Sequence, residues 1–195
     1  MRTMLTRFAA AVSLAVALVA AAVPVHAQDA PRAESVKAAF LYHFGSYVEW
    51  PETAGEPAAT TIGVFGDDAV VAELEQLLPR RMLRNRPVKV RALKAADDLE
   101  NVQILFVGSA AKQPQQLVQA AQQRSILIIT DMPDGLERGG MINFVMAERR
   151  VRFEISRPAA EKAGLKFSSR LLAVAMRVKS SGLLFNLNPP AIVNS

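Results

Sequence analysis

Short apolar runs alternate with helix-like segments along the middle of the chain. Four of these runs are predicted to be strands, at 61–65, 88–93, 103–107 and 126–130. Helices are predicted between them at 69–78 and 114–123. The runs QILFV and ILIIT are apolar at almost every position, which is typical of strands buried on both faces of a parallel sheet. The middle of the chain therefore predicts an α/β fold.

The pattern changes towards the C-terminus. Two segments, 141–147 and 151–155, flank three charged residues, and apolar and charged positions alternate in the second segment. This period of two predicts an antiparallel hairpin with one solvated side, on which Glu154 would lie. A short helix at 158–163 and a last helix from about 168 to 179 follow. Together the elements predict a single-domain α/β fold, a three-layer sandwich with a mostly parallel sheet and a C-terminal antiparallel hairpin.

A ring-rich stretch, FLYHFGSYVEWPE, precedes the first predicted strand in a chain with only 6% aromatic residues. Three rings recur at the i, i+4 and i+7 spacing of a helix stripe that faces a core, namely Phe40, Phe44 and Tyr47. The helix, predicted over 35–49, ends at Trp50 because a residue before proline is disfavoured in the α region. Trp50 and Tyr42 lie off the centre of the stripe, so they are candidates for contact with a partner protein.

The first residues have the composition of a secretory signal. Arg2 and Arg7 give a positive start, the apolar run 8–23 follows, and small residues precede a cleavage site after Ala27. The apolar run is shorter than the roughly 20 residues that a membrane span needs. We therefore expect residues 28–195 to form one exported domain.

The composition argues against most kinds of catalysis. The chain has no cysteine, and once His26 leaves with the signal only His43 remains. A Ser-His-Asp triad could use no other histidine, and an ordinary zinc site needs three or four ligands. The stretch Gly63 to Gly66 lacks the spacing of a phosphate-binding loop. The sequence therefore predicts no enzyme, no catalytic residue, no metal site and no cofactor.

Basic residues are concentrated in one segment of an otherwise mildly basic chain. Without Arg2 and Arg7, 21 basic residues face 18 acidic ones, and for an exported protein of this charge nucleic acid is not an expected partner. Seven basic residues crowd into positions 80–94, namely Arg80, Arg81, Arg84, Arg86, Lys89, Arg91 and Lys94. Such a run could dock on an acidic partner, or it could protect the edge strand of a sheet from pairing. Arg84 and Arg86 join Tyr42 and Trp50 as candidate partner-binding residues.

Three polar side chains follow the predicted parallel strands directly. Asp67, Ser109 and Asp131 come after the runs TIGVF, QILFV and ILIIT. Ligands of open α/β sheets usually bind at the carboxyl ends of the strands, so these residues could mark the edge of a ligand site. They could equally cap the next helix, because Asp and Ser side chains accept bonds from the first backbone N–H groups.

Taken in order, the motifs resemble the YfiR family of periplasmic regulators from Val36 to Val178. The similarity rests on VKAAFLYHFGSYVEWPE, TIGVFGDD, NRPVKVR, ILFVGSA, ILIITD, GGMINFVMAERRVRFEIS and AAEKAGLKFSSRLLAVAMRV. The resemblance implies no catalytic residue. Its signature residues Trp50, Asn143 and Glu154 could be structural as much as functional.

The resemblance implies a function in signalling. Proteins of this family bind the periplasmic sensor domain of a membrane-anchored diguanylate cyclase and repress it, which lowers cyclic di-GMP and limits biofilm formation. An outer-membrane lipoprotein of the OmpA or Pal type can sequester the repressor, and family members often form homodimers. Some relatives carry redox-linked cysteine pairs, which this chain lacks.

A second reading is a periplasmic sensor that binds a small ligand. Its cleft would lie at the edge marked by Asp67, Ser109 and Asp131. An exported hydrolase is disfavoured, because only His43 could serve it.

Overall fold

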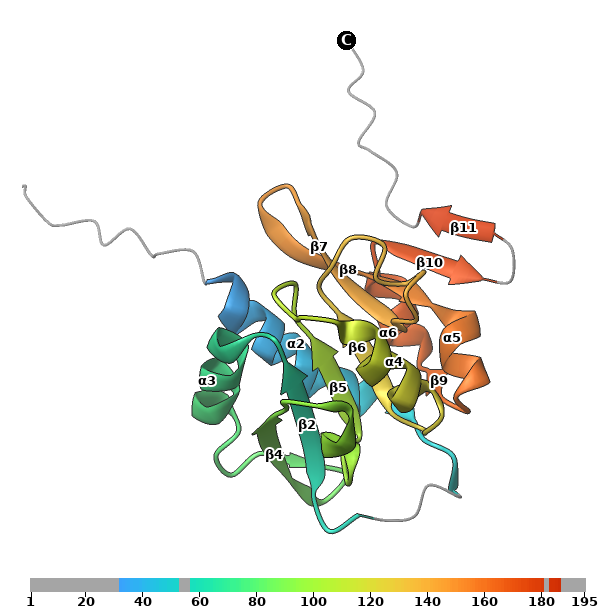
Figure 1. Cartoon of the computed structure of the whole chain (residues 1–195). Coiled ribbons are helices and arrows are strands. Elements are labelled where there is room, and N and C mark those ends of the chain that lie inside the picture. The colour runs from blue at the N-terminus through green and yellow to red at the C-terminus, as the bar shows by residue number, and fades with distance from the viewer. Residues whose placement is uncertain (1–31, 53–56, 181–182, 187–195) are drawn as a thin grey trace, which may run out of the picture. The chain divides into compact units, whose positions relative to one another are not determined.

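The computed structural model describes residues 32–52, 57–180 and the backbone of 183–186 (Figure 1). The predicted signal, residues 1–27, lies outside this part, so its cleavage after Ala27 stays a prediction. The helices are α2 (Ala33–Tyr47), α3 (Asp68–Leu77), the 3-10 helix η3 (Ala96–Leu99), α4 (Pro114–Gln122), α5 (Arg157–Lys162) and α6 (Ser169–Val174). The strands are β1 (Val48–Glu49), β2 (Thr60–Phe65), β3 (Met82–Leu83), β4 (Arg86–Ala92), β5 (Ile104–Val107), β6 (Leu127–Thr130), β7 (Ile142–Ala147), β8 (Arg150–Ser156), β9 (Lys166–Phe167), β10 (Arg177–Ser180) and β11 (Leu183–Asn186).

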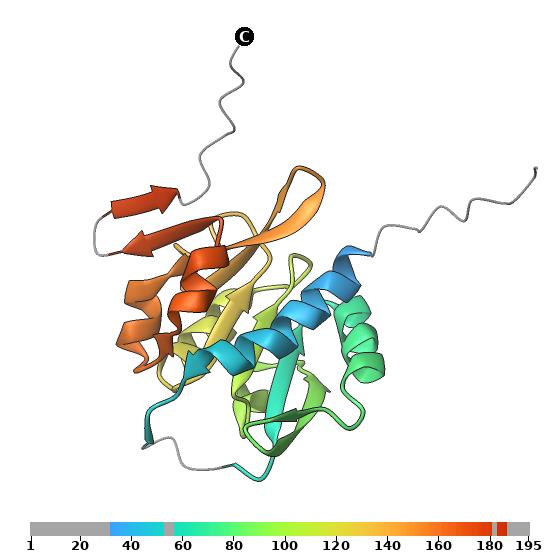
Figure 2. The ribbon, with the colours of Figure 1, turned by 180° about the vertical axis from the view of Figure 1, so that it is seen from behind.

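Most of these strands belong to one sheet. Its order is β11-β10-β8-β7-β6-β5-β2-β4-β3, and β1 pairs separately with β9. Strands β4, β2, β5, β6 and β7 are parallel neighbours, whereas β7 and β8 form the predicted antiparallel hairpin. Helix α2 crosses one face of the sheet and α4 lies on the other (Figures 1 and 2). The predicted α/β sandwich with a mostly parallel sheet is therefore confirmed.

The apolar runs form the centre of the sheet. Every residue of β5 and β6 is buried, as expected for strands covered on both faces. Strand β4 lies near the sheet edge, where Val88 is buried while Lys89 and Arg91 are exposed. The basic run therefore lies on an edge of the sheet, the position where charged side chains discourage pairing with another chain.

The aromatic stripe of α2 packs against the hairpin. Phe44 is buried, and its ring centroid lies 5.6 Å from that of Phe40, 5.9 Å from Phe144 of β7 and 5.0 Å from Phe153 of β8. Such ring pairs add about 0.5–1.5 kcal/mol each beyond the area they bury. Tyr47 is partly buried against the same core. The prediction that these rings face the core is confirmed.

The last predicted helix is shorter than expected. Helix α6 ends at Val174, and Ala175 is already extended, with a ψ of 141°. Residues 177–180 then form β10, which lies parallel to β8 and leaves Val178 buried. The helix prediction is wrong beyond Val174 because β8 offers an open edge whose backbone groups β10 satisfies.

The same strand changes the surroundings of Glu154. Arg177 lies opposite Glu154 in the register of β10 and β8, and the two side chains form an ion pair of 2.7 Å. The residue Glu154 is only 6% exposed. The prediction that it lies on a solvated side of the hairpin is wrong, because β10 covers that edge.

Candidate functional site

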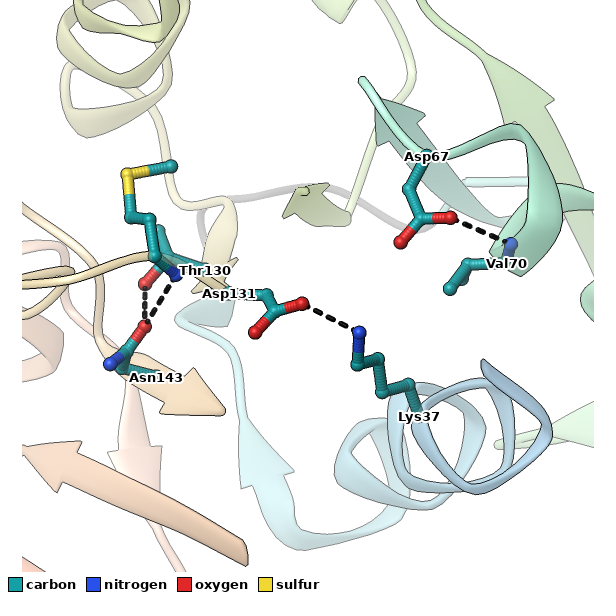
Figure 3. A network of polar contacts seen from close by, with 7 residues as sticks. Lys37, Asp67, Val70, Thr130, Asp131 and Asn143 are labelled. Carbon is teal, nitrogen blue, oxygen red and sulfur yellow. Dashed lines mark hydrogen bonds and ion pairs between the residues drawn. The ribbon is translucent and has the colours of Figure 1, made fainter. Parts of the chain in front are cut away.

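The three polar residues predicted at the carboxyl edge of the sheet do lie at the ends of β2, β5 and β6. The Asp67 carboxylate accepts a 3.0 Å hydrogen bond from the backbone N–H of Val70 and so caps α3 (Figure 3). Asp131 does not cap a helix. Its carboxylate forms a partly buried ion pair of 2.6 Å with Lys37 of α2 (Figure 3). Ser109 is exposed in the turn after β5.

Close backbone packing fills part of this edge. Gly66 has a φ of +76° after β2, and a Cβ added at Gly108 would lie only 2.6 Å from the Gly66 carbonyl oxygen. The loops after β2 and β5 therefore pack backbone against backbone. Within the described residues, no group of three His, Asp or Glu side chains is placed to hold a metal ion.

A buried polar contact links β6 to β7 beside this edge. The Thr130 hydroxyl donates a 2.7 Å hydrogen bond to Oδ1 of Asn143, and the Met132 N–H approaches the same oxygen at 3.4 Å (Figure 3). A Cβ at Gly135 would lie 2.2 Å from the Thr130 hydroxyl oxygen. The Asn143 side chain thus joins two strands and the loop between them, which is a structural role.

The opposite edge of the sheet contains a cavity of about 770 Å³. Its walls include Thr60 at the start of β2, Arg86 at the start of β4, Gln103 just before β5 and Ile126 just before β6. We call it the amino-edge cavity, because the amino ends of four parallel strands meet there. Its remaining lining residues are Gly45, Trp50, Pro51, Glu52, Pro57, Leu83, Arg84, Leu99, Asn101, Val102, Arg124 and Ser125. Its volume lies within the range of small-molecule sites, roughly 300–1,000 Å³.

Trp50 and Arg84 form one wall of the amino-edge cavity. The Arg84 guanidinium carbon lies 5.0 Å from the centroid of the Trp50 ring, a cation–π distance, and one guanidinium N–H donates to the carbonyl of Val48. Arg84 belongs to the two-residue turn between β3 and β4, where it and Asn85 both have positive φ. The Trp50 Nε1–H is buried and has no hydrogen-bond partner in the described chain.

Three of the four predicted partner-binding residues share this cavity. Trp50, Arg84 and Arg86 line it, while Tyr42 lies outside. The Tyr42 hydroxyl donates a 3.1 Å hydrogen bond to the Met82 carbonyl, and the Arg81 guanidinium lies 5.7 Å from its ring centroid. Arg84 and Arg86 therefore belong to the β3–β4 hairpin, and Tyr42 and Trp50 contact it.

Sequence reasoning missed most polar contributors to the cavity, among them Arg124 and Ser125. These two residues follow α4 and precede β6, in a turn without any motif. Only the folded arrangement of parallel strands brings this turn to Trp50. No signal in the sequence pointed to it.

Within the described part of the chain, His43 makes no contact with a carboxylate. It is exposed on α2, and its ring centroid lies 5.2 Å from that of Tyr42. This is the environment of a surface residue.

Comparison with known proteins identifies the family. No protein of curated function is similar enough to this chain to count as a relative. A solved structure of a conserved domain protein from Vibrio cholerae O1 biovar El Tor is 14% identical, with a TM-score of 0.48; the match covers 75% of this chain and 60% of that chain. Among the described residues, no helix has the length and apolar character needed to cross a bilayer. The profile of YfiR/HmsC-like proteins matches residues 34–176, and the chain therefore belongs to the YfiR/HmsC-like family.

Proposed function

We propose that this protein represses a membrane-anchored diguanylate cyclase by binding its periplasmic sensor domain, which lowers cyclic di-GMP and limits biofilm formation. Membership of the YfiR/HmsC-like family supports a regulatory role in the periplasm in general, and this is the observation that carries the proposal. Export with cleavage after Ala27 is part of the same proposal.

Repression would work by stoichiometric contact. A ligand that binds one state of a two-state sensor more tightly shifts the sensor towards that state. The repressor would therefore hold the cyclase in its inactive state without chemical turnover. An outer-membrane lipoprotein of the OmpA or Pal type would relieve repression by competing for the repressor, and the repressor itself could act as a homodimer.

The β3–β4 hairpin is the contact surface that we favour. The hairpin contains Arg84 and Arg86, and it is contacted by Tyr42 and Trp50. At its start, Met82 is 50% exposed. Exposed Lys89 and Arg91 extend the positive charge along β4. An aromatic and arginine centre with a charged rim is the composition of many interface hot spots, so an acidic patch on the sensor domain would fit it.

The protein is proposed to be a regulator and not an enzyme. His43, the histidine that a hydrolase would need, is exposed on α2 beside the Tyr42 ring. A hydrolytic activity abolished by His43→Ala would contradict this part of the proposal.

Direct binding tests the proposal. The purified protein should form a complex of fixed stoichiometry with the purified periplasmic sensor domain of a cyclase from the same organism, measured by calorimetry. Arg84→Gln combined with Arg86→Gln should weaken the complex, and more strongly at low salt, whereas Arg138→Gln, at an exposed position outside the β3–β4 hairpin, should not. Absence of a complex with each such sensor domain in the organism would refute it.

A second candidate function is that of a periplasmic sensor for a small ligand. The observation in its favour is the amino-edge cavity. The carboxyl edge around Asp67 and Asp131 is less suited to a ligand, because both carboxylates already have partners.

A further inference from the structure

We propose that the amino-edge cavity binds a small organic anion, a molecule that carries a carboxylate or phosphate group on an apolar body. This inference rests on the cavity alone. It would stand if the cyclase proposal failed, and it would fail without affecting that proposal.

The cavity has an apolar side that fits the body of such a molecule. Trp50, Pro51, Pro57 and Leu83 supply ring and aliphatic surface, and the buried Val102 adds to it. Small-ligand sites are usually lined in this way, with a few polar groups that fix the orientation. A cavity of about 770 Å³ has room for a ligand the size of a substituted aromatic ring.

The polar side of the cavity is positively charged. Among the described residues, its lining contains three arginines, Arg84, Arg86 and Arg124, and one carboxylate, Glu52. The planar guanidinium group matches the geometry of carboxylate and phosphate oxygens and binds them in a bidentate way. The three arginines come from two separate segments, the β3–β4 hairpin and the turn before β6, and the fold brings them together at one edge of the sheet.

Two of the arginines, Arg84 and Arg124, have N–H groups that could donate hydrogen bonds to a ligand. Arg84 gives one N–H to the Val48 carbonyl, and a guanidinium group has five donors. Arg124 is exposed, and no described residue forms an ion pair with its side chain. Asn101 and Ser125 add neutral hydrogen-bonding groups to the same lining.

Trp50 lies beside these donors in the cavity lining. Its Nε1–H is buried, and no described residue accepts a hydrogen bond from it. The Arg84 guanidinium lies over the Trp50 ring. An anion that pairs with Arg84 would therefore bind beside the Trp50 indole.

The experiment uses the indole itself. Trp50 is the only tryptophan of the chain, so its fluorescence reports on this cavity alone. Purified protein is titrated with phenyl phosphate and with benzoate, each beside benzamide as the uncharged analogue and inorganic phosphate as the headgroup without a body. We expect a saturable fluorescence change and a raised melting temperature with at least one of the two aromatic anions, and much weaker binding of benzamide and inorganic phosphate. The aromatic anion that binds tells whether the natural ligand is a phosphate or a carboxylate.

Matched charge variants locate the site. Arg124→Gln should weaken binding of the anion by about tenfold, the loss of one charge-assisted hydrogen bond. Arg138→Gln removes the same charge from an exposed position outside the cavity lining and should leave the affinity unchanged. Equal binding of benzamide, equal effects of the two variants, or no saturable response to either aromatic anion would overturn the proposal.

Discussion

Asp98 stabilises a turn through the charge of a single side chain. Its carboxylate accepts hydrogen bonds from the backbone N–H groups of Lys94, at 2.8 Å, and Ala95, at 3.1 Å. These bonds, first that of Lys94, favour the ionised form and lower the pKa of Asp98 below its ordinary value of 3.8. A pKa that is lower in the folded state adds stability above the unfolded value, and that stability is lost as the pH falls through the folded pKa.

We predict that Asp98→Asn lowers the urea midpoint slightly at neutral pH. The difference from the unmodified protein should shrink as the pH falls from 3.8 through the lower pKa of folded Asp98, because the aspartic acid is then protonated and as uncharged as the asparagine. Urea unfolding over a series of pH values measures this. A difference that is as large in acid as at neutral pH would contradict the role of the charge.

The surroundings of Gly135 leave no space for a side chain. A Cβ at this position would lie 2.2 Å from the Thr130 hydroxyl oxygen and 2.3 Å from Oδ1 of Asn143. We predict that Gly135→Ala lowers the free energy of unfolding by about 1–3 kcal/mol, the usual range for overpacking. Chemical denaturation measures it, with Ser109→Ala in an exposed turn as the control. A stability equal to that of the control would show that the loop can move aside.

Strand β10 is held to β8 by an ion pair as well as by backbone bonds. Arg177 is 42% exposed while the Glu154 side chain is 8% exposed, so removal of the arginine would leave a buried carboxylate without a partner. We predict that Arg177→Met costs roughly 2 kcal/mol, less than the loss expected for a fully buried pair. The double variant Arg177→Met with Glu154→Gln should recover most of it. A double variant as unstable as the single one would refute the account.

The turn of the β7–β8 hairpin is built from residues that disfavour its geometry. Glu148 and Arg149 both have positive φ, at 49° and 61°, which is the two-residue turn that strongly prefers Asn-Gly. We predict that Glu148→Asn with Arg149→Gly raises the free energy of unfolding by about 1 kcal/mol. Thermal and urea unfolding check this, with Arg152→Gln as a charge control. No gain in stability would mean that the turn geometry differs from that described.

Segments whose pattern fits only one kind of element were predictable, and segments whose pattern fits both a helix and a strand were not. The strands β5 and β6 are apolar at nearly every position, so length and composition were enough to find them. The segment LLAVAMRVK suits a helix and a strand alike. Its outcome depends on the open edge of β8, a tertiary contact that local patterns do not contain.

The candidate site was predictable only in part for the same reason. The order of the strands in the sequence correctly predicts that Asp67 and Asp131 lie at the carboxyl edge of the sheet. Lys37, which forms an ion pair with Asp131, belongs to α2, a helix far away in the sequence. The amino-edge cavity joins Trp50, Arg84 and Arg124 from three segments far apart in the chain. Such a site forms only when the strands assemble into the sheet, so no local sequence pattern predicts it.

The proposed repressor acts as a whole exported molecule, so its central test belongs in the cell. The measurement is intracellular cyclic di-GMP in a strain that lacks this gene, with the protein supplied either complete or without residues 1–27. We predict that deletion raises cyclic di-GMP and that the complete protein lowers it again, whereas the version without residues 1–27 does not. An unchanged level on deletion, with a membrane-anchored cyclase shown to be expressed, would contradict repression by this protein.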